Sequence, residues 1–135
     1  MAILKRDDIM KIQDLTFEEV DVPEWGGSVR IKMMTGSERD AYEASLYELK
    51  GQEVKMNRDD VRAKLLVKCL VDENNERLFT DAEIKMLGKK SAKVLDKLFT
   101  VAQRLNAMTD EDVKKLEKNS VSEGEGYSTS PLPKS

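Results

Sequence analysis

Apolar residues recur along this chain with two different periods. Near the N-terminus they alternate with polar residues, which is the period of a β-strand with one buried face. The alternating positions are Val20 and Val22 before a Pro-Glu-Trp-Gly-Gly turn, and Val29, Ile31 and Met33 after it. Two alternating runs around a Gly-Gly pair predict a β-hairpin over residues 17–34, since glycine adopts the positive φ angles of tight turns. Residues 1–16 have a weaker apolar pattern and are expected to form an arm that docks on the body or on a neighbouring subunit.

Beyond the hairpin the apolar spacing becomes helical, with a period near 3.6. Thr35–Glu38 and Thr80–Glu83 both match a capping box, in which a threonine hydroxyl and a glutamate satisfy the free N–H groups of a helix start. Asn57 is the expected cap of a central apolar helix, and Gly51 is the expected end of the helix before it. Five helices are therefore predicted. They cover about 35–49, 57–70, 80–87, 91–106 and 109–118.

The last stretch, 119–135, is rich in Ser, Gly and Pro. It has too few apolar residues to offset an ordering cost of about 1–2 kcal/mol per residue, so a disordered tail is expected. The predicted fold class is mainly α, indeed close to all-α. About five helices form one small domain over 17–118, with an N-terminal β-hairpin at 17–34 and a flexible C-terminal tail.

Composition argues against catalysis. The 135 residues include no histidine and a single cysteine, Cys69, which lies in an apolar run. Nucleophiles activated by histidine and His-based metal sites are therefore absent, and the adjacent carboxylates fall mostly at predicted helix starts, where they cap. We expect no enzymatic activity, no cofactor and no metal. No apolar run is long enough to span a membrane, and the charged N-terminus does not resemble a secretory signal, so a cytoplasmic protein without membrane contact is expected.

A basic stretch in the second half offers an alternative function. Between Lys85 and Arg104 there are six basic residues against one acidic residue, Asp96. The two helices predicted around Gly88 have the outline of a helix-turn-helix, so a small DNA-binding protein is the alternative. The first turns of the second helix carry no Asn, Gln or Arg to read base edges. A solvated helix face is therefore favoured, and no nucleic-acid partner is expected.

Four stretches of sequence together resemble the tail assembly chaperones of long-tailed bacteriophages with non-contractile tails. The likeness covers about 14–118. The stretches are V-x-V-P-E-W-G-G from Val20, T-G-x-E-R-D from Thr35, C-L-x-D-E-N…L-F from Cys69, and L-x-x-L-F…L-N-A-M from Leu95. The resemblance implies a protein that binds the tape-measure protein, keeps it soluble, helps tail-tube protein polymerise around it, and is absent from the mature virion.

The resemblance also implies a longer form of the protein made by a −1 ribosomal frameshift, with this chain as the short form. Leu132, Pro133 and Lys134 can be encoded by CTC-CCA-AAA, which contains the slip-prone heptamer C-CCA-AAA ending on the codons of Pro133 and Lys134. A homo-oligomer is expected as well. A structural adaptor subunit that stays in the particle remains a further alternative.

Apolar side chains of the predicted hairpin and of the segment after it are the expected contacts with the client or with other copies. Trp25 either folds back over the Gly-Gly turn or lies exposed at a protein contact, where tryptophan is over-represented. The adjacent methionines either fill the core near the ends of elements, which is the favoured interpretation, or belong to a surface that accepts varied apolar partners. The candidate contact residues are Trp25, Val29, Ile31, Met33 and Met34.

Overall fold

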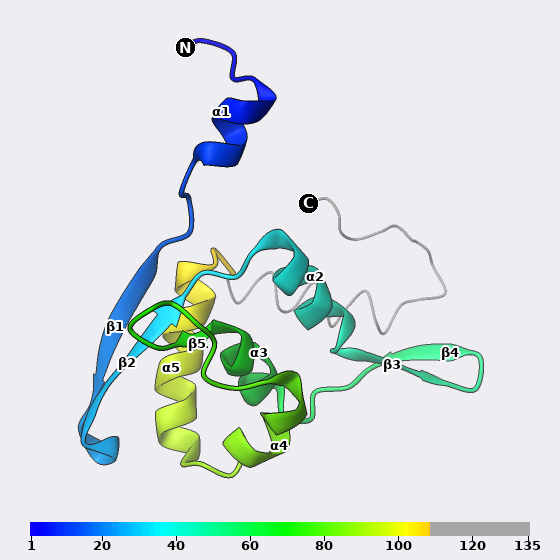
Figure 1. Ribbon diagram of the computed structural model, residues 1–135. Coiled ribbons are helices and arrows are strands. Elements are labelled where there is room, and N and C mark those ends of the chain that lie inside the picture. The colour runs from blue at the N-terminus through cyan, green and yellow to red at the C-terminus, as the bar shows by residue number, and fades with distance from the viewer. Residues whose placement is uncertain (109–135) are drawn as a thin grey trace.

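The computed structural model describes residues 1–108 of the chain. Helices and strands both build this part (Figure 1). The elements, in chain order, are α1 (Arg6–Lys11), β1 (Phe17–Val22), the 3₁₀ turn η1 (Pro23–Trp25), β2 (Gly27–Lys32), α2 (Gly36–Ala44), β3 (Tyr47–Lys50), β4 (Glu53–Met56), α3 (Val61–Cys69), β5 (Leu70–Val71), the 3₁₀ turn η2 (Asp81–Glu83), α4 (Ile84–Leu87) and α5 (Ala92–Leu105).

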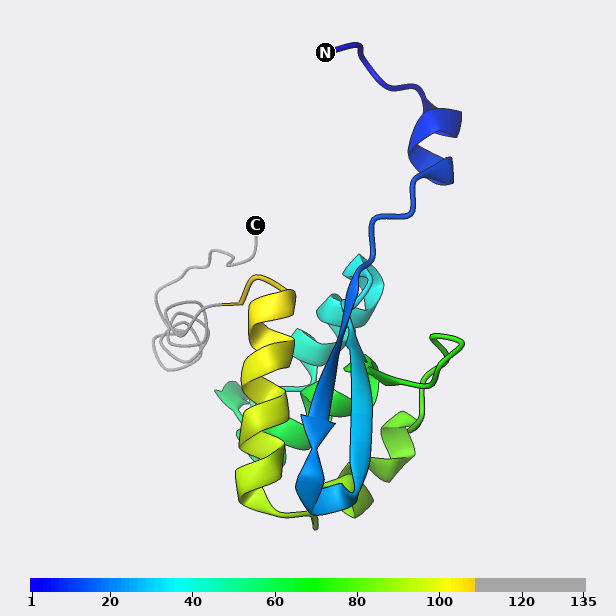
Figure 2. The ribbon, with the colours of Figure 1, turned by 90° about the vertical axis from the view of Figure 1, so that its left-hand side faces the viewer.

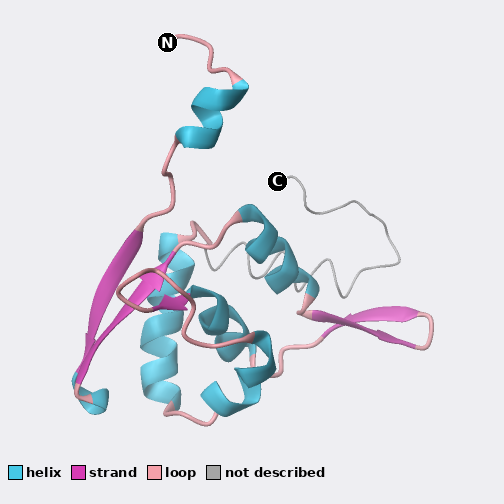
Figure 3. Cartoon of the chain, viewed as in Figure 1, coloured by secondary structure: helices cyan, strands magenta, loops and turns pink. Residues whose placement is uncertain are grey.

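The expectation of a mainly α, nearly all-α fold is wrong. The described residues contain a three-stranded antiparallel sheet in the order β1-β2-β5 and a separate two-stranded sheet, β3–β4 (Figure 3). Residues 1–108 contain five α-helices, but one of them is the short α1 of the N-terminal arm. The helix predicted at 109–118 and the tail predicted at 119–135 lie outside the described residues. The fold is a mixture of α and β structure.

The second sheet accounts for most of this error. A single helix was expected to run to Leu49 and stop at Gly51, whereas α2 ends at Ala44 and the chain forms a hairpin over 47–56. Gly51 has φ of +66° in the two-residue connection, which suits the first central position of a type II′ turn. Residues on both sides of this glycine alternate in polarity, so a period of two was present in the sequence.

The first hairpin is where the sequence places it. Its strands pair from Phe17 opposite Lys32 to Val22 opposite Gly27, and β5 adds to β2 through Arg30 opposite Val71. One face of this sheet packs against α3 and α5 (Figure 2). The other face carries polar side chains, because successive residues of a strand point to opposite sides.

The core lies between this sheet, α3 and α5. Ile31 from the sheet, Leu66 from α3 and Leu98 from α5 are fully buried. Helix α5 begins after Ser91, whose hydroxyl accepts from the N–H of Val94, as the sequence predicts. Burying large aliphatic side chains of this kind contributes about 1.5–3 kcal/mol each before entropy is counted.

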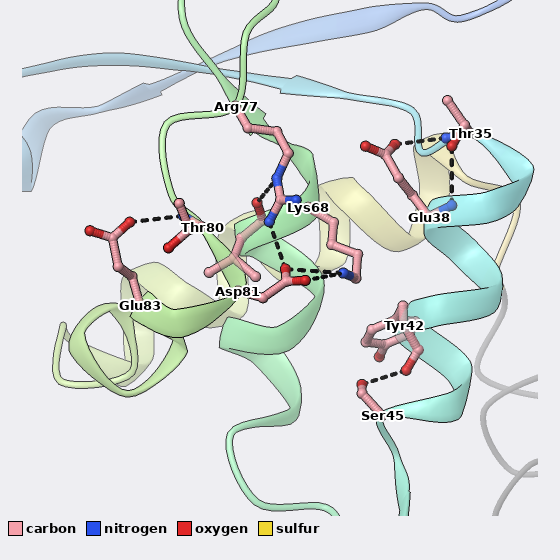
Figure 4. A network of polar contacts seen from close by, with 10 residues as sticks. Thr35, Glu38, Tyr42, Ser45, Lys68, Arg77, Thr80, Asp81 and Glu83 are labelled. Carbon is pink, nitrogen blue, oxygen red and sulfur yellow. Dashed lines mark hydrogen bonds and ion pairs between the residues drawn. The ribbon is translucent and has the colours of Figure 1, made fainter.

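Both predicted capping boxes are present. Thr35 and Glu38 exchange hydrogen bonds of 2.9 and 3.1 Å at the start of α2 (Figure 4). Thr80 and Glu83 form the second box, but it opens a 3₁₀ turn and the four-residue α4 rather than a full helix.

The predicted cap of the central helix is wrong. Helix α3 begins at Val61 after Asp60, which has φ of +55°. Asn57 lies further upstream, and its side chain instead accepts from the N–H of Asp59 at 2.8 Å. At the other end of α3 the chain continues as strand β5 from Leu70, which the helical pattern had assigned to the helix.

A buried asparagine joins three elements at the end of α5. The side-chain oxygen of Asn106 accepts from the N–H of Met34 at 2.8 Å, and its Nδ2 donates to the carbonyl of Ala102 and lies 3.7 Å from Sγ of Cys69. After Asn106, Ala107 has φ of +56°, and the N–H of Met108 donates to the carbonyl of Gln103 in α5. These are the features of a Schellman C-cap.

Candidate functional site

The N-terminal arm, residues 1–16, stands away from the body in both views (Figures 1 and 2). Its helix α1 is short, and the carboxylate of Asp8 accepts from the N–H of Lys5 at 3.0 Å. No residue of α1 is buried. The exposed apolar side chains of the arm include Ile3 (92%), Leu4 (54%), Ile9 (54%), Met10 (70%) and Ile12 (49%). Exposed apolar side chains gathered on one segment are typical of a protein contact.

The arm is fixed to the body at its root. The N–H and hydroxyl of Thr16 lie 3.3 and 3.1 Å from the sulfur of Met33, and the N–H of Met33 donates to the carbonyl of Thr16 at 2.9 Å. The next residue, Phe17, is half exposed and lies under the guanidinium of Arg30 at 4.0 Å. The root of the arm is therefore held by the end of the β1–β2 pair.

The structure does not bring the candidate contact residues together on one surface. Ile31 and Met34 are buried in the core, and Val29 packs against it. Trp25 is exposed at the turn of the hairpin, whereas Met33 lies at the opposite end, beside the arm. Alternation along β2 explains the result, because it directs Val29 and Ile31 to the face that packs on the helices.

The second hairpin, β3–β4, was missed as a candidate surface. It projects from the body on the side away from the first hairpin (Figure 1). Leu49 is 70% exposed and Val54 is 47% exposed. The alternation around Gly51 was the signal that could have found it.

The basic stretch is partly neutralised in the folded chain. Lys85 lies 2.7 Å from a carboxylate oxygen of Asp60, and Lys97 donates to the carbonyl of Asp21 at 2.6 Å. Arg104 donates to Glu18 at 3.0 Å, and this hydrogen bond lowers the pKa of the Glu18 carboxyl. With half of its basic residues so engaged and a first helix, α4, of only four residues, this region does not favour the DNA-binding alternative.

A buried lysine and an arginine hold the loop after β5 on α3. The carboxylate of Asp81 accepts from Arg77 at 2.8 Å and from Lys68 at 3.1 Å (Figure 4). These hydrogen bonds, with that of Arg77 the larger, lower the pKa of Asp81. Arg77 also donates to the carbonyl of Val67. All of these donors and acceptors are paired with one another, so the cluster stabilises the fold.

The cysteine and the acidic side chains of the described part also lack the features of a reactive or metal-binding site. Burial raises the pKa of the Cys69 thiol to about 12, which keeps it protonated and unreactive. Residues 1–108 hold no group of three or more His, Cys, Asp or Glu side chains placed to bind a metal ion. Within the same part of the chain, no helix has the length and apolar content needed to cross a membrane.

Comparison with known proteins identifies the fold and then the family. The structure is similar to that of the bacteriophage HK97 tail assembly chaperone, with a TM-score of 0.54 and 19% sequence identity over 73% of this chain and 88% of that one. The family model described as phage tail assembly chaperone matches residues 8–116. The chain therefore belongs to the phage tail assembly chaperone family, as the sequence resemblance indicated. No curated protein sequence matches it.

Proposed function

We propose that this protein binds the tape-measure protein of a long-tailed phage in the host cytoplasm, keeps it soluble, and yields it to tail-tube protein during assembly. On this proposal the protein acts without catalysis and is absent from the finished virion. Membership of the tail assembly chaperone family supports the general role. The tape measure as client is the inference that the sequence resemblance adds.

The observation that carries the proposal is the exposed apolar arm on a member of this family. Six apolar side chains of the arm are about half exposed or more. A tape-measure protein is expected to expose apolar helical stripes until the tube covers it, and an apolar segment can cover such a stripe. Many copies, each bound weakly, would hold a long client by avidity and still be displaced one at a time.

The arm can be tested by coexpression with the tape-measure protein. Ile9→Asp combined with Met10→Asp removes two exposed apolar side chains, each worth on the order of 1–2 kcal/mol when buried in a contact. We expect the amount of tape-measure protein that stays soluble and copurifies to fall about tenfold or more. Lys11→Asp is the matched control, since it lowers the net charge by the same amount and removes no apolar side chain.

Three results would each count against a part of this proposal. Capture by the double variant at the level of the unmodified chain would exclude the arm as the contact. Failure of the unmodified chain to retain any tape-measure protein would contradict the proposed function itself. Detection of the chain in purified particles would favour the structural adaptor instead.

The proposal includes a longer, frameshifted form and self-association. Its genetic test is the nucleotide sequence over the codons of Pro133 and Lys134, where an X-XXY-YYZ heptamer is expected. Trp25, which is exposed, and Met33, which is half-buried beside the arm, remain proposed contacts for these partners.

A further inference from the structure

The β3–β4 ribbon, residues 47–56, is a two-stranded sheet that projects into solvent (Figures 1 and 3). Its register places Leu49 opposite Val54, so these side chains share one face. The opposite face is charged and pairs Glu48 with Lys55 and Lys50 with Glu53. A two-stranded sheet alone is only marginally stable in water, and further strands stabilise it.

The outer edges of the ribbon offer free backbone groups at its two apolar positions. The N–H of Asn57 donates to the carbonyl of Leu46 at the base of the ribbon. Hydrogen-bonded and non-hydrogen-bonded pairs alternate in an antiparallel ladder, so the N–H and C=O groups of Leu49 and Val54 point outward. No group among residues 1–108 bonds to them. Each edge is therefore open to another strand.

The charges beside Val54 are complementary to a second copy of the same strand. Val54 is flanked by Glu53 and Lys55. Antiparallel pairing of two β4 strands about a two-fold axis at Val54 places Glu53 of each copy opposite Lys55 of the other. Opposite charges in directly facing positions contribute about 0.2–1 kcal/mol per pair. The apolar faces of the two ribbons also become continuous in this arrangement.

Strand β3 has the same order of charges but is less open. The carboxylate of Glu48 accepts from Nδ2 of Asn57 at 3.3 Å and lies 3.4 Å from the ammonium of Lys50. Its side chain is 40% exposed, against 69% for Glu53 of β4. The β-branched side chain of Val54 also favours an extended, paired strand.

We infer that the β4 edge is a self-association surface, on which a second copy of this chain adds its own β4 to form a four-stranded antiparallel sheet. The interface is isologous, since each copy presents the same residues to the other. The inference gives the self-association in the proposed function a location and a register. It does not depend on the identity of the client.

Charge reversal in the full chain tests the register by sedimentation velocity over a range of concentrations. Lys55→Glu and Glu53→Lys each place like charges opposite each other in the symmetric pair, so each variant alone should self-associate about tenfold more weakly than the unmodified chain. An equimolar mixture of the two variants restores both opposite-charge pairs. Its association should return to within about threefold of the unmodified chain.

Lys50→Glu is the matched control, because it makes the same charge change on the β3 edge and disturbs one cross-strand pair within the ribbon, as Lys55→Glu does. It should leave association within about twofold of the unmodified chain. A folding defect in either variant would persist in the mixture. Recovery in the mixture therefore shows that the weaker association of each variant alone comes from its charges.

A chain that stays monomeric at all concentrations, variants that associate normally, or a mixture that does not recover would each overturn the inference. Loss of association with Lys50→Glu alone would assign pairing to β3 and would also overturn it. Tape-measure capture measured on the same samples separates the two ideas. Capture without self-association removes this interface and the proposed self-association, and leaves the proposed binding of the tape-measure protein intact.

Discussion

The two hairpins of this protein share a local design and differ in their surroundings. Both consist of alternating apolar and polar residues around a glycine-containing turn. The first, β1–β2, receives a third strand and packs on α3 and α5, so that Val22 and Ile31 are fully buried. The second, β3–β4, keeps its apolar side chains Leu49 and Val54 in solvent. The same pattern thus builds a core in one place and an open edge in the other.

Truncating one apolar side chain in each hairpin should produce the largest contrast. Ile31→Ala leaves a cavity in the core and should lower the free energy of unfolding by about 2–5 kcal/mol. Val54→Ala removes exposed surface and should change it by about 0.5 kcal/mol or less. Urea unfolding at low protein concentration measures both. Equal losses would mean that the ribbon is also part of the cooperative core.

An asparagine side chain bonds close to the end of each hairpin, Asn106 to the N–H of Met34 and Asn57 to the N–H of Asp59, which permits a second, smaller comparison. Asn106→Ala deprives the N–H of Met34 of its acceptor in a buried site and should cost about 1–3 kcal/mol. Asn57→Ala, at the base of the ribbon, removes an acceptor from the exposed N–H of Asp59, which water can replace. It should cost less than about 1 kcal/mol. Thermal unfolding of both variants measures the two losses of stability. A larger loss from Asn57→Ala than from Asn106→Ala would contradict the prediction.

The smallest expected effect is a dependence on pH in the first hairpin. The hydrogen bond from Arg104 lowers the pKa of Glu18 in the folded chain below its ordinary value of 4.5. A lowered folded-state pKa stabilises the protein above the unfolded pKa, and this contribution is lost as pH falls through the lowered value. Glu18→Gln should therefore lose less stability than the unmodified chain between pH 6 and about pH 3. Identical pH profiles would show that the pair contributes nothing, as many exposed pairs do.

The elements predicted correctly from the sequence are those whose defining residues lie close together in the chain. The Thr35 and Thr80 capping boxes, the β1–β2 hairpin and α5 all depend on residues within one or two turns of one another. Helix α2 was extended too far because Leu46 and Leu49 also fit a helical spacing. A short apolar run fits both periods, and here the period of two around Gly51 competes with the helical period.

The candidate contact set shows the limit of the same reasoning at the surface. An apolar residue on a strand is identified equally well whether it is buried or exposed, since alternation shows which residues share a face but not what covers that face. The set therefore includes Ile31, although it belongs to the core, as does Met34 after the strand. Leu49 and Val54, which are exposed, were left out.

The sequence by itself determined the family, the first hairpin, the two capping boxes and the long C-terminal helix of the described part, because each rests on motifs within short stretches of chain. Only the tertiary structure decided that Leu70 and Val71 form a third strand, that Ile31 lies inside, and that the arm and the ribbon project from the body. These outcomes depend on contacts between residues far apart in the chain. A local pattern sets the period of an element, whereas its neighbours decide which of its faces meets water.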